Sequence, residues 1–385
     1  MRKIIMLLDN DFKSDNRVEK EATSLINNNY SVTVVCLQNP SLPKQEIRNG
    51  MLIIRCIEPA LYSHPFSKKA IQGSKTLTAF LLNETFDILH CHDFNLIHIG
   101  SALKQRGKNV KVVYDSHEFL KKYPMHENVK LPFNRLKAFI VWKLLLIREK
   151  KAAKYYDAFL TTTEIIAQKL SQHLAINLYT YLRNIPETQN IVPSNYLKNT
   201  FGLPLDSILI IHSGNIYFQP ELLVDIYKGI QNCGKNIFLA FFIAPDRSQK
   251  FKKFVDEQGM SSVIFFHDYP QKENIIQYLA SANIGFSWVN PAFMSQVYTS
   301  ANRFWEYSLA ELPVLSNYQW EICREIENKQ NGVVYTIDQV GFQNALHTIL
   351  DNYNHFKKNA IATAKNDSWE KESLKLIALY DALYR

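Results

Sequence analysis

Short apolar runs alternate with longer amphipathic stretches along almost the whole chain of 385 residues. Runs this rich in Val, Ile, Leu and Phe are typical of parallel strands, which helices cover on both faces. The alternation therefore predicts an α/β protein with doubly wound sheets. The predicted strands are 3–8, 31–37, 51–57, 86–91, 110–114, 158–163, 207–212, 236–243, 262–266, 284–288, 312–316 and 331–335.

The alternation breaks once, between residues 183 and 206, where Pro186, Pro193 and Pro204 fall in a polar stretch. Because a chain of this length is too long for one ordinary core, we interpret the stretch as a domain joint. The expected parts are an N-terminal domain over 1–184, a linker over 185–206, a C-terminal domain over 207–366, and a closing helix over 367–385 that packs back across the N-terminal domain.

Composition excludes several classes of protein. Hydrophobic residues make up 46% and charged residues 21%, as in a globular protein rather than a disordered one. The five cysteines are scattered and form no Cys-x-x-Cys pair, so we expect reduced thiols in a reducing compartment. The net charge of +8 favours an anionic partner, which on charge alone is a nucleic acid, an acidic membrane surface or a phosphorylated substrate.

The first eight residues carry a short basic start, but their apolar stretch stops at Asp9 and lacks a cleavage site of small residues. We interpret them as a first buried strand. No later apolar run reaches the roughly 18 residues that indicate a membrane span. The sequence therefore predicts a cytoplasmic protein.

Polar residues follow three predicted strands of the first half, at the strand ends where doubly wound sheets bind ligands. In the first loop Asp15 or Asn16 suits a helix cap, while Arg17 and nearby amides suit an anion site. The next two loops each bring a histidine beside a carboxylate, which is compatible with a solvated turn or with a catalytic site. Neither has the spacing of a known metal motif, so we expect no metal. The two loops are His90-Cys91-His92-Asp93 and Asp115-Ser116-His117-Glu118.

Two segments of the second half suit nucleotide chemistry. Gly214 ends a predicted strand in a turn of small residues, where backbone amides can approach a phosphate closely. On a helix predicted from Asn302, Arg303 and Glu306 share a face. The cation near the helix start offers an anion site, and the carboxylate can accept two hydrogen bonds from a ribose. The alternative is a surface ion pair contributing roughly a few tenths of a kcal/mol.

This helix and the strand after it resemble the donor-binding signature of GT-B glycosyltransferases of the family-4, group-1 type. Arg303 stands where that signature usually has lysine. The similarity continues in order along nearly the whole chain. Matching residues are Asp15, Arg17–Ala22, Asp115–Glu118, Arg183–Pro186, Ser213–Asn215, Asn302, Glu306, Tyr307, Leu312–Val314 and Ser368–Glu370.

The resemblance implies a GT-B fold, with two Rossmann-like domains facing across a cleft. It implies transfer of a sugar, with retention, from a nucleoside diphosphate sugar to an acceptor hydroxyl, without a metal or another cofactor. Glu306 would bind the ribose, and Arg303 with the Gly214 turn would bind the diphosphate. The implied donor-binding residues are Gly214, Asn215, Arg247, Tyr298, Asn302, Arg303 and Glu306. The implied catalytic residues are His117 and Glu118, and the implied acceptor-side residues are Asp15, Arg17, His92 and Asp93.

The chain departs from the family pattern at three places. Tyr298 stands where many members have a first glutamate, no basic pair follows Gly214, and Glu311 replaces a glycine. An inactive sugar-nucleotide-binding relative, a phosphorylase and a nucleotide-sugar epimerase therefore remain alternatives. An oxidoreductase is disfavoured because no Gly-x-Gly-x-x-Gly follows a strand. A nucleic-acid partner is disfavoured because the cations are spread out.

The segment 135–151 mixes aromatic and apolar residues with many cations. Such a helix either packs one face on the N-terminal sheet or lies on an anionic membrane surface. In the membrane interpretation the enzyme is peripheral on the inner face of the cytoplasmic membrane. A glycan or lipid-linked acceptor, as in capsule or lipopolysaccharide assembly, would then suit it.

Overall fold

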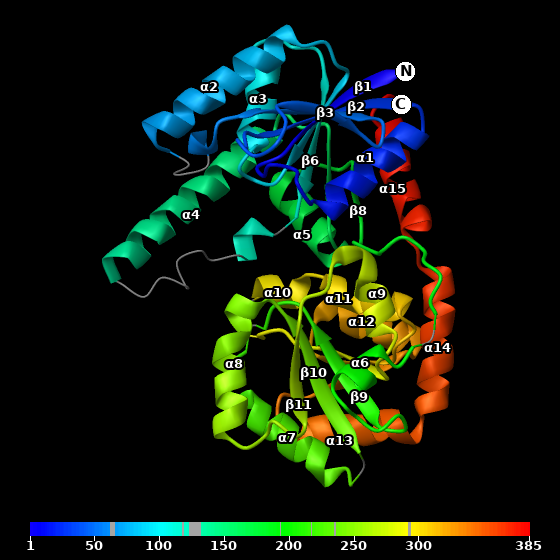
Figure 1. Ribbon diagram of the computed structural model, residues 1–385. Helices are drawn as coiled ribbons and strands as arrows, with labels where there is room; N and C mark the ends of the chain where they lie inside the picture. The colour runs from blue at the N-terminus through cyan, green and yellow to red at the C-terminus, as the bar shows by residue number, and fades with distance from the viewer. Residues whose placement is uncertain are drawn as a thin grey trace. The chain divides into compact units, whose positions relative to one another are not determined.

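The computed structural model describes residues 1–61, 66–117, 119–122, 132–192, 194–216, 218–234, 236–291 and 294–385. The chain divides into two compact units (Figure 1). Unit 1 contains Met1–Arg183 and Glu370–Arg385, and unit 2 contains Asn184–Trp369. Each unit is built on its own sheet.

The sheet of unit 1 has eight strands among the described residues, in the order β3-β4-β2-β1-β5-β6-β7-β8. All neighbours pair in parallel except β3, which runs antiparallel to β4. Every residue of β5 is buried, as expected for a strand covered on both faces. The strands are β1 (Arg2–Leu7), β2 (Tyr30–Leu37), β3 (Gln45–Arg48), β4 (Met51–Ile57), β5 (Ile88–His92), β6 (Lys111–Ser116), β7 (Ala158–Thr161) and β8 (Tyr179–Tyr181).

The predicted strands omit β3 and β8, the two edge strands of this sheet. The first reads Gln-Glu-Ile-Arg, with Ile47 79% exposed, so it carries no apolar run. The second has only three residues. Edge strands need less apolar surface than central ones, which explains the omission.

Side-chain caps fix the starts of several helices in unit 1. Asp15 Oδ1 accepts a hydrogen bond from the Val18 amide at 3.2 Å, and the Ser67 hydroxyl caps the next helix in the same way. Thr163 caps α5. The helices are α1 (Asn16–Asn27), α2 (Lys68–Asn83), α3 (Ile97–Gln105), α4 (Pro132–Ala153), α5 (Glu164–Leu174) and α15 (Trp369–Ala382), whose residues from Glu370 onward belong to unit 1.

The closing helix α15 is attached to the sheet of unit 1 by polar and aromatic contacts. The hydroxyl of Tyr380 lies 2.7 Å from Nδ1 of His90 on β5, and its ring meets Tyr30 edge-on at 5.6 Å. Near the start of the helix, Glu372 accepts hydrogen bonds from the Arg183 guanidinium at 2.8 and 3.1 Å. The last residues of the chain thus complete the N-terminal core.

Helix α4 has two apolar faces, of which one is buried. Trp142 and Leu145 are buried against Leu120, and the Trp142 indole donates to the Leu120 carbonyl at 2.9 Å. A second stripe at three- and four-residue spacing is exposed. It consists of Leu136 (59% exposed), Phe139 (37%), Ile140 (50%), Leu144 (43%) and Ile147 (51%). None of the helices in the described part of the chain is long and apolar enough to cross a membrane.

The sheet of unit 2 has six described strands, all paired in parallel, in the order β11-β10-β9-β12-β13-β14. Its strands are β9 (Ile208–Ser213), β10 (Ile237–Ile243), β11 (Ile264–Asp268), β12 (Ile284–Ser287), β13 (Val314–Asn317) and β14 (Gly332–Tyr335). Its helices are α6 (Tyr196–Thr200), α7 (Leu222–Asn232), α8 (Pro245–Glu257), α9 (Ile275–Leu279), α10 (Met294–Tyr298), α11 (Asn302–Leu309), α12 (Trp320–Lys329), α13 (Gln339–Asp351) and α14 (Tyr353–Asn366).

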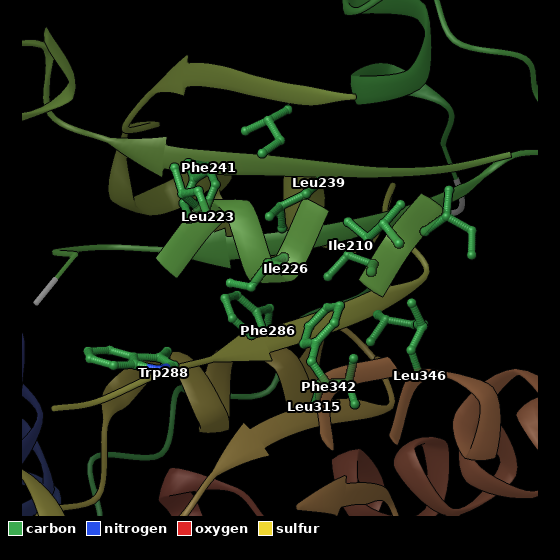
Figure 2. Close-up of a cluster of buried hydrophobic side chains, with 14 of the residues drawn as sticks. Ile210, Leu223, Ile226, Leu239, Phe241, Phe286, Trp288, Leu315, Phe342 and Leu346 are labelled. Atoms are coloured by element: carbon green, nitrogen blue, oxygen red, sulfur yellow. The ribbon is translucent and has the colours of Figure 1, made fainter. Parts of the chain in front are cut away.

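Helices cover both faces of this second sheet. Successive side chains of β9 accordingly pack into two different hydrophobic clusters, one on each face. Ile210 belongs to a cluster with α7 and α13, shown in Figure 2, whereas Leu209 and Ile211 pack with α9, α11 and α12 on the other face. Burying each such side chain contributes about 1.5–3 kcal/mol. Labelled members of the first cluster are Ile210, Leu223, Ile226, Leu239, Phe241, Phe286, Trp288, Leu315, Phe342 and Leu346.

Candidate functional site

The carboxyl end of β9 forms the centre of the candidate site in unit 2. His212 and Ser213 are buried, and Gly214 follows with φ of +94°, a conformation that favours glycine. A Cβ atom at Gly214 would lie 3.8 Å from Arg303 Nη2. The start of α11 therefore lies beside this turn.

Arg303 is 9% exposed and is held by uncharged groups. Its Nη1 donates to Nε2 of His212 at 2.8 Å, and its Nη2 donates to the Asn215 carbonyl at 3.2 Å. Burial and the Arg303 charge hold the pKa of His212 well below its usual range, so the imidazole is neutral and accepts the hydrogen bond. Among the described residues no carboxylate forms an ion pair with Arg303. A buried guanidinium with only neutral acceptors favours an anionic ligand.

Tyr307 fixes the distance between α11 and the sheet. Its hydroxyl accepts from the Ser213 amide and donates to the Phe286 carbonyl, both at 2.9 Å. Gly285 on β12 lies so close that a Cβ atom there would be 2.4 Å from Tyr307 Cγ. The glycine thus allows the close approach that brings Arg303 to His212.

Glu306 is half-buried on α11 and lies near Tyr269, the residue that follows β11. Burial and the Glu306 charge raise the pKa of Tyr269 to about 12. Sequence reasoning missed Tyr269 and the role of His212, and for His212 the only signal was its place directly before the Gly214 turn. The structure thus adds an aromatic side chain and an imidazole to the expected donor residues.

Of the other expected donor residues, Arg247 contacts Asn215, and Tyr298 and Asn302 come shortly before Arg303 in the chain. Arg247, exposed in the first turn of α8, donates to Asn215 Oδ1. Tyr298 ends α10, and Asn302 is the exposed first residue of α11. The alternative interpretation, in which Arg303 and Glu306 form an ion pair on the surface, is wrong. The Arg303 side chain is buried and points toward His212 on β9.

In unit 1, Asp115 at the end of β6 is the centre of a charged network. Its carboxylate lies 3.3 Å from Arg17 Nη2, 3.2 Å from His92 Nδ1 and 3.0 Å from His117 Nε2. Arg17 also forms an ion pair with Glu21 at 3.1 Å and donates to the Leu182 carbonyl at 2.9 Å. Arg17 and His92 are buried, so within this network they position Asp115 and His117.

His117 is the half-buried member of the network, with its side chain 24% exposed. Burial alone would lower its pKa, but Asp115 and Asp93 outweigh burial and raise the pKa to about 10. Asp93 Oδ2 lies 3.4 Å from His117 Nδ1, and Asp93 itself has φ of +63°. His117 is therefore an imidazolium at neutral pH, suited to donating a hydrogen bond rather than accepting a proton. Glu118 lies outside the described residues.

Four ligand atoms of Glu21, His90, His92 and Asp115 lie within 4.8 Å of one another, a grouping that suits a metal ion. The same side chains also contact Arg17 and the imidazolium of His117, whose positive charges offset those of the carboxylates. Burial and Asp115 raise the pKa of Glu21 to about 7, whereas Arg17 and His117 hold that of Asp115 well below its usual range, against burial. We assign the group as a buried ion-pair network.

The raised pKa of His117 predicts a pH-dependent contribution to stability. A histidine whose pKa rises on folding stabilises the folded state. The stabilisation is complete at pH values below the pKa of the unfolded state, about 6.5. It is lost as the pH rises through the folded-state pKa of about 10. His117→Gln is expected to lower the free energy of unfolding by about 1.5–3 kcal/mol at pH 6 and by less at pH 10. Urea unfolding of both proteins at the two pH values measures this, and a difference that grows with pH would contradict it.

Comparisons with known proteins agree with this architecture. Residues 16–178 match the profile of Glycosyltransferase Family 4. No curated protein matches the sequence. A sucrose-phosphate synthase from Thermosynechococcus elongatus has a TM-score of 0.72 at 15% identity, covering 100% of this chain and 99% of the other. A glycosyltransferase from Rickettsia africae ESF-5 gives 0.71 at 12% identity, with coverages of 100% and 99%. An E. coli trehalose-6-phosphate structure bound with UDP-2-fluoro glucose gives 0.67 at 12% identity, with both coverages 98%.

The two parallel sheets and the full-length match define the GT-B fold, which confirms the expected fold class. With the match to residues 16–178, they identify the protein as a glycosyltransferase. The family match over residues 16–178, together with the shared fold, supports a glycosyltransferase of the family-4, group-1 type.

Proposed function

We propose that the enzyme transfers a sugar from a nucleoside diphosphate sugar to an acceptor hydroxyl, with the donor bound by unit 2. The observation that carries the proposal is the buried Arg303 guanidinium beside the Gly214 turn, held only by neutral groups in the described structure. A diphosphate would supply the missing negative charge. The E. coli structure with UDP-2-fluoro glucose, which shares the fold, supports a nucleotide-linked donor.

The proposed donor contacts follow from the geometry around β9. Arg303 and the amides of the Gly214 turn bind the diphosphate, and the exposed Arg247, placed by Asn215, adds a second cation. Glu306 accepts hydrogen bonds from the ribose hydroxyls. Tyr298 and Asn302 contact the donor near the start of α11. No metal is needed in this scheme, because cations and backbone amides stabilise the departing diphosphate.

In unit 1, His117 acts as a charged hydrogen-bond donor to the acceptor. Its imidazolium, held by Asp115 and Asp93, does not remove the acceptor proton at neutral pH. In the proposed retaining reaction the bond from the anomeric carbon to the diphosphate breaks and a bond to the acceptor oxygen forms. The proton of the acceptor hydroxyl passes to an oxygen of the departing phosphate.

We further propose that the acceptor is a glycan or a lipid-linked sugar used in surface polysaccharide or glycolipid assembly. Helix α4 supports this, because its exposed apolar stripe lies among six cations and a single acidic residue, Glu149, which is buried. Such a helix can bind an anionic membrane surface. None of the five cysteines, all of which the structure describes, forms a disulfide, which suits the reducing cytoplasmic side.

Release of nucleoside diphosphate tests the donor assignment. Purified enzyme is incubated with UDP-, GDP- and ADP-sugars, and the diphosphate product is quantified for wild type and Glu306→Ala. We expect turnover with one nucleotide and a loss of about tenfold to a hundredfold in kcat/KM in the variant, corresponding to about 1.4–2.7 kcal/mol for lost charged hydrogen bonds. Glu311→Ala, on the turn after α11, is the matched control. Equal turnover by wild type and Glu306→Ala would remove the ribose assignment.

A further inference from the structure

The side chain of His212, at the carboxyl end of β9, connects Arg303 to the sheet of unit 2. The imidazole is completely buried, and its two nitrogens have different partners. Nε2 lies 2.8 Å from Arg303 Nη1, and Nδ1 lies 3.1 Å from the carbonyl oxygen of Phe286 on β12. The other polar contacts of the ring, from Nδ1 to Arg303 Nη1 and from Nε2 to the Asn215 carbonyl, are longer at 3.4 Å.

The two short contacts define the protonation state of the ring. A guanidinium can only donate hydrogen bonds and a carbonyl oxygen can only accept them. Nε2 must therefore accept from Arg303 while Nδ1 donates to Phe286, which requires a neutral imidazole with its proton on Nδ1. Burial and the charge of Arg303 act in the same direction, because both hold the pKa of His212 well below its usual range.

The Phe286 carbonyl also fixes the position of helix α11. Tyr307 follows Arg303 by one helical turn and donates to this same oxygen at 2.9 Å. Residues four apart lie on one face of a helix, so α11 is connected to the sheet at two successive turns. The imidazole and the helix that carries Arg303 are thus held by one shared acceptor.

A neutral acceptor suits a cation that has to bind an anion. A carboxylate in the place of the imidazole would orient the guanidinium, but its charge would repel a diphosphate. The imidazole gives Arg303 a direction without adding negative charge. The ring also packs against Phe241 and Phe286, with centroids 5.5 and 5.7 Å away. Packing alone would be met by any flat ring, so the role of the two nitrogens can be tested separately.

We propose that His212 is a positioning residue for donor binding, which as the Nδ1–H tautomer accepts a hydrogen bond from Arg303 and directs its guanidinium toward the diphosphate. His212 itself does not contact the donor and exchanges no proton during the reaction. The inference rests on the proposed function for the identity of the anion. The tautomer and the hydrogen bond to Arg303 are properties of the free protein.

Nitrogen-15 NMR of the substrate-free protein, labelled at histidine, tests the hydrogen bond directly. The His212 signals are assigned as those missing from His212→Gln. We expect a neutral ring with its proton on Nδ1 at pH 6, where an ordinary histidine is largely protonated. In Arg303→Met the Nε2 signal should move downfield, because its hydrogen-bond donor is gone. A charged ring, a proton on Nε2 alone, or an Nε2 signal that Arg303→Met leaves unchanged would overturn the proposal.

Steady-state kinetics of two His212 variants tests the positioning role. Asparagine can replace the donor to Phe286 but leaves Arg303 without its acceptor, whereas glutamine places an acceptor near the position of Nε2. We expect His212→Asn to lower kcat/KM about tenfold or more, and His212→Gln to stay within about threefold of wild type. His355→Gln, at an exposed histidine of α14, is expected to match wild type. Equal activity of the folded Asn variant and wild type would overturn the proposal.

A double variant separates positioning from general damage to the fold. In the Arg303→Met background, His212→Asn is expected to cost little further activity, because no guanidinium remains to be directed. Fully additive losses would show that His212 acts independently of Arg303 and would overturn the proposal. If no nucleotide sugar is turned over but the NMR result holds, the donor assignment fails and the hydrogen bond is confirmed. If turnover occurs but the ring carries its proton on Nε2, the positioning role fails and the proposed function stands.

Discussion

Replacing Arg303 with alanine is expected to lower kcat/KM for the nucleotide sugar by about 10²–10³-fold. Arg303 is the buried cation of the donor site, and in the proposed reaction it stabilises the charge of the departing diphosphate. Removing one preorganised donor of this kind costs about 2.7–4 kcal/mol of transition-state stabilisation. The measurement is steady-state kinetics with the nucleotide sugar that wild type uses.

Two controls separate this loss from damage to the fold. Arg303→Met keeps much of the side-chain volume without the charge, so it is expected to lose the same activity with a smaller loss of thermal stability. Arg247→Ala removes an exposed cation from the same site and is expected to lose less activity, because solvent already screens its charge. Near-wild-type kcat/KM in Arg303→Met would exclude a role in diphosphate binding.

Replacing Asp115 with alanine is expected to destabilise unit 1 by about 3–5 kcal/mol. The carboxylate is fully buried and contacts Arg17, His92 and His117. Without it, the buried Arg17 guanidinium and the His117 imidazolium lose a counter-ion. For a unit of this size the midpoint of thermal unfolding should fall by about 10 °C. Differential scanning calorimetry measures the shift.

The matched control for Asp115 is Asp246, whose side chain is 78% exposed at the start of α8. Asp246→Ala is expected to change stability by less than about 0.5 kcal/mol. A second variant, Asp115→Asn, keeps the shape and one acceptor oxygen, so it should show an intermediate loss. If Asp115→Ala unfolds at the wild-type temperature, the network is not a buried ion-pair core.

Much of the fold could be predicted from the sequence because parallel strands are continuous apolar runs. Strand β5 is buried at every residue and β10 at every residue except Phe238, and both are continuous apolar runs in the sequence except for the two histidines of β5. The edge strand β3 is polar and the edge strand β8 is short, so neither has that pattern. The start of α1 could be predicted to within one residue, because Asp15 and Asn16 are both typical caps, and the structure shows that Asp15 is the cap.

The candidate site was less predictable because its partners come from distant parts of the chain. The motif around Asn302 indicated Arg303 and Glu306, but it did not show that Arg303 turns inward to His212 on β9. That contact depends on how closely α11 approaches the sheet, which Gly285 permits. Likewise, the pairing of Arg17 with Asp115 joins residues 98 positions apart. The spacing of residues in the sequence does not indicate such long-range contacts.

The most direct test of the account is calorimetric titration of wild type and Arg303→Met with UDP, GDP and ADP. The account predicts that one nucleoside diphosphate binds wild type with a stoichiometry of one, and that Arg303→Met binds it at least tenfold more weakly. That outcome would place the diphosphate at the turn after β9. Failure of all three to bind wild type, or equal binding to both proteins, would contradict the donor site proposed for unit 2.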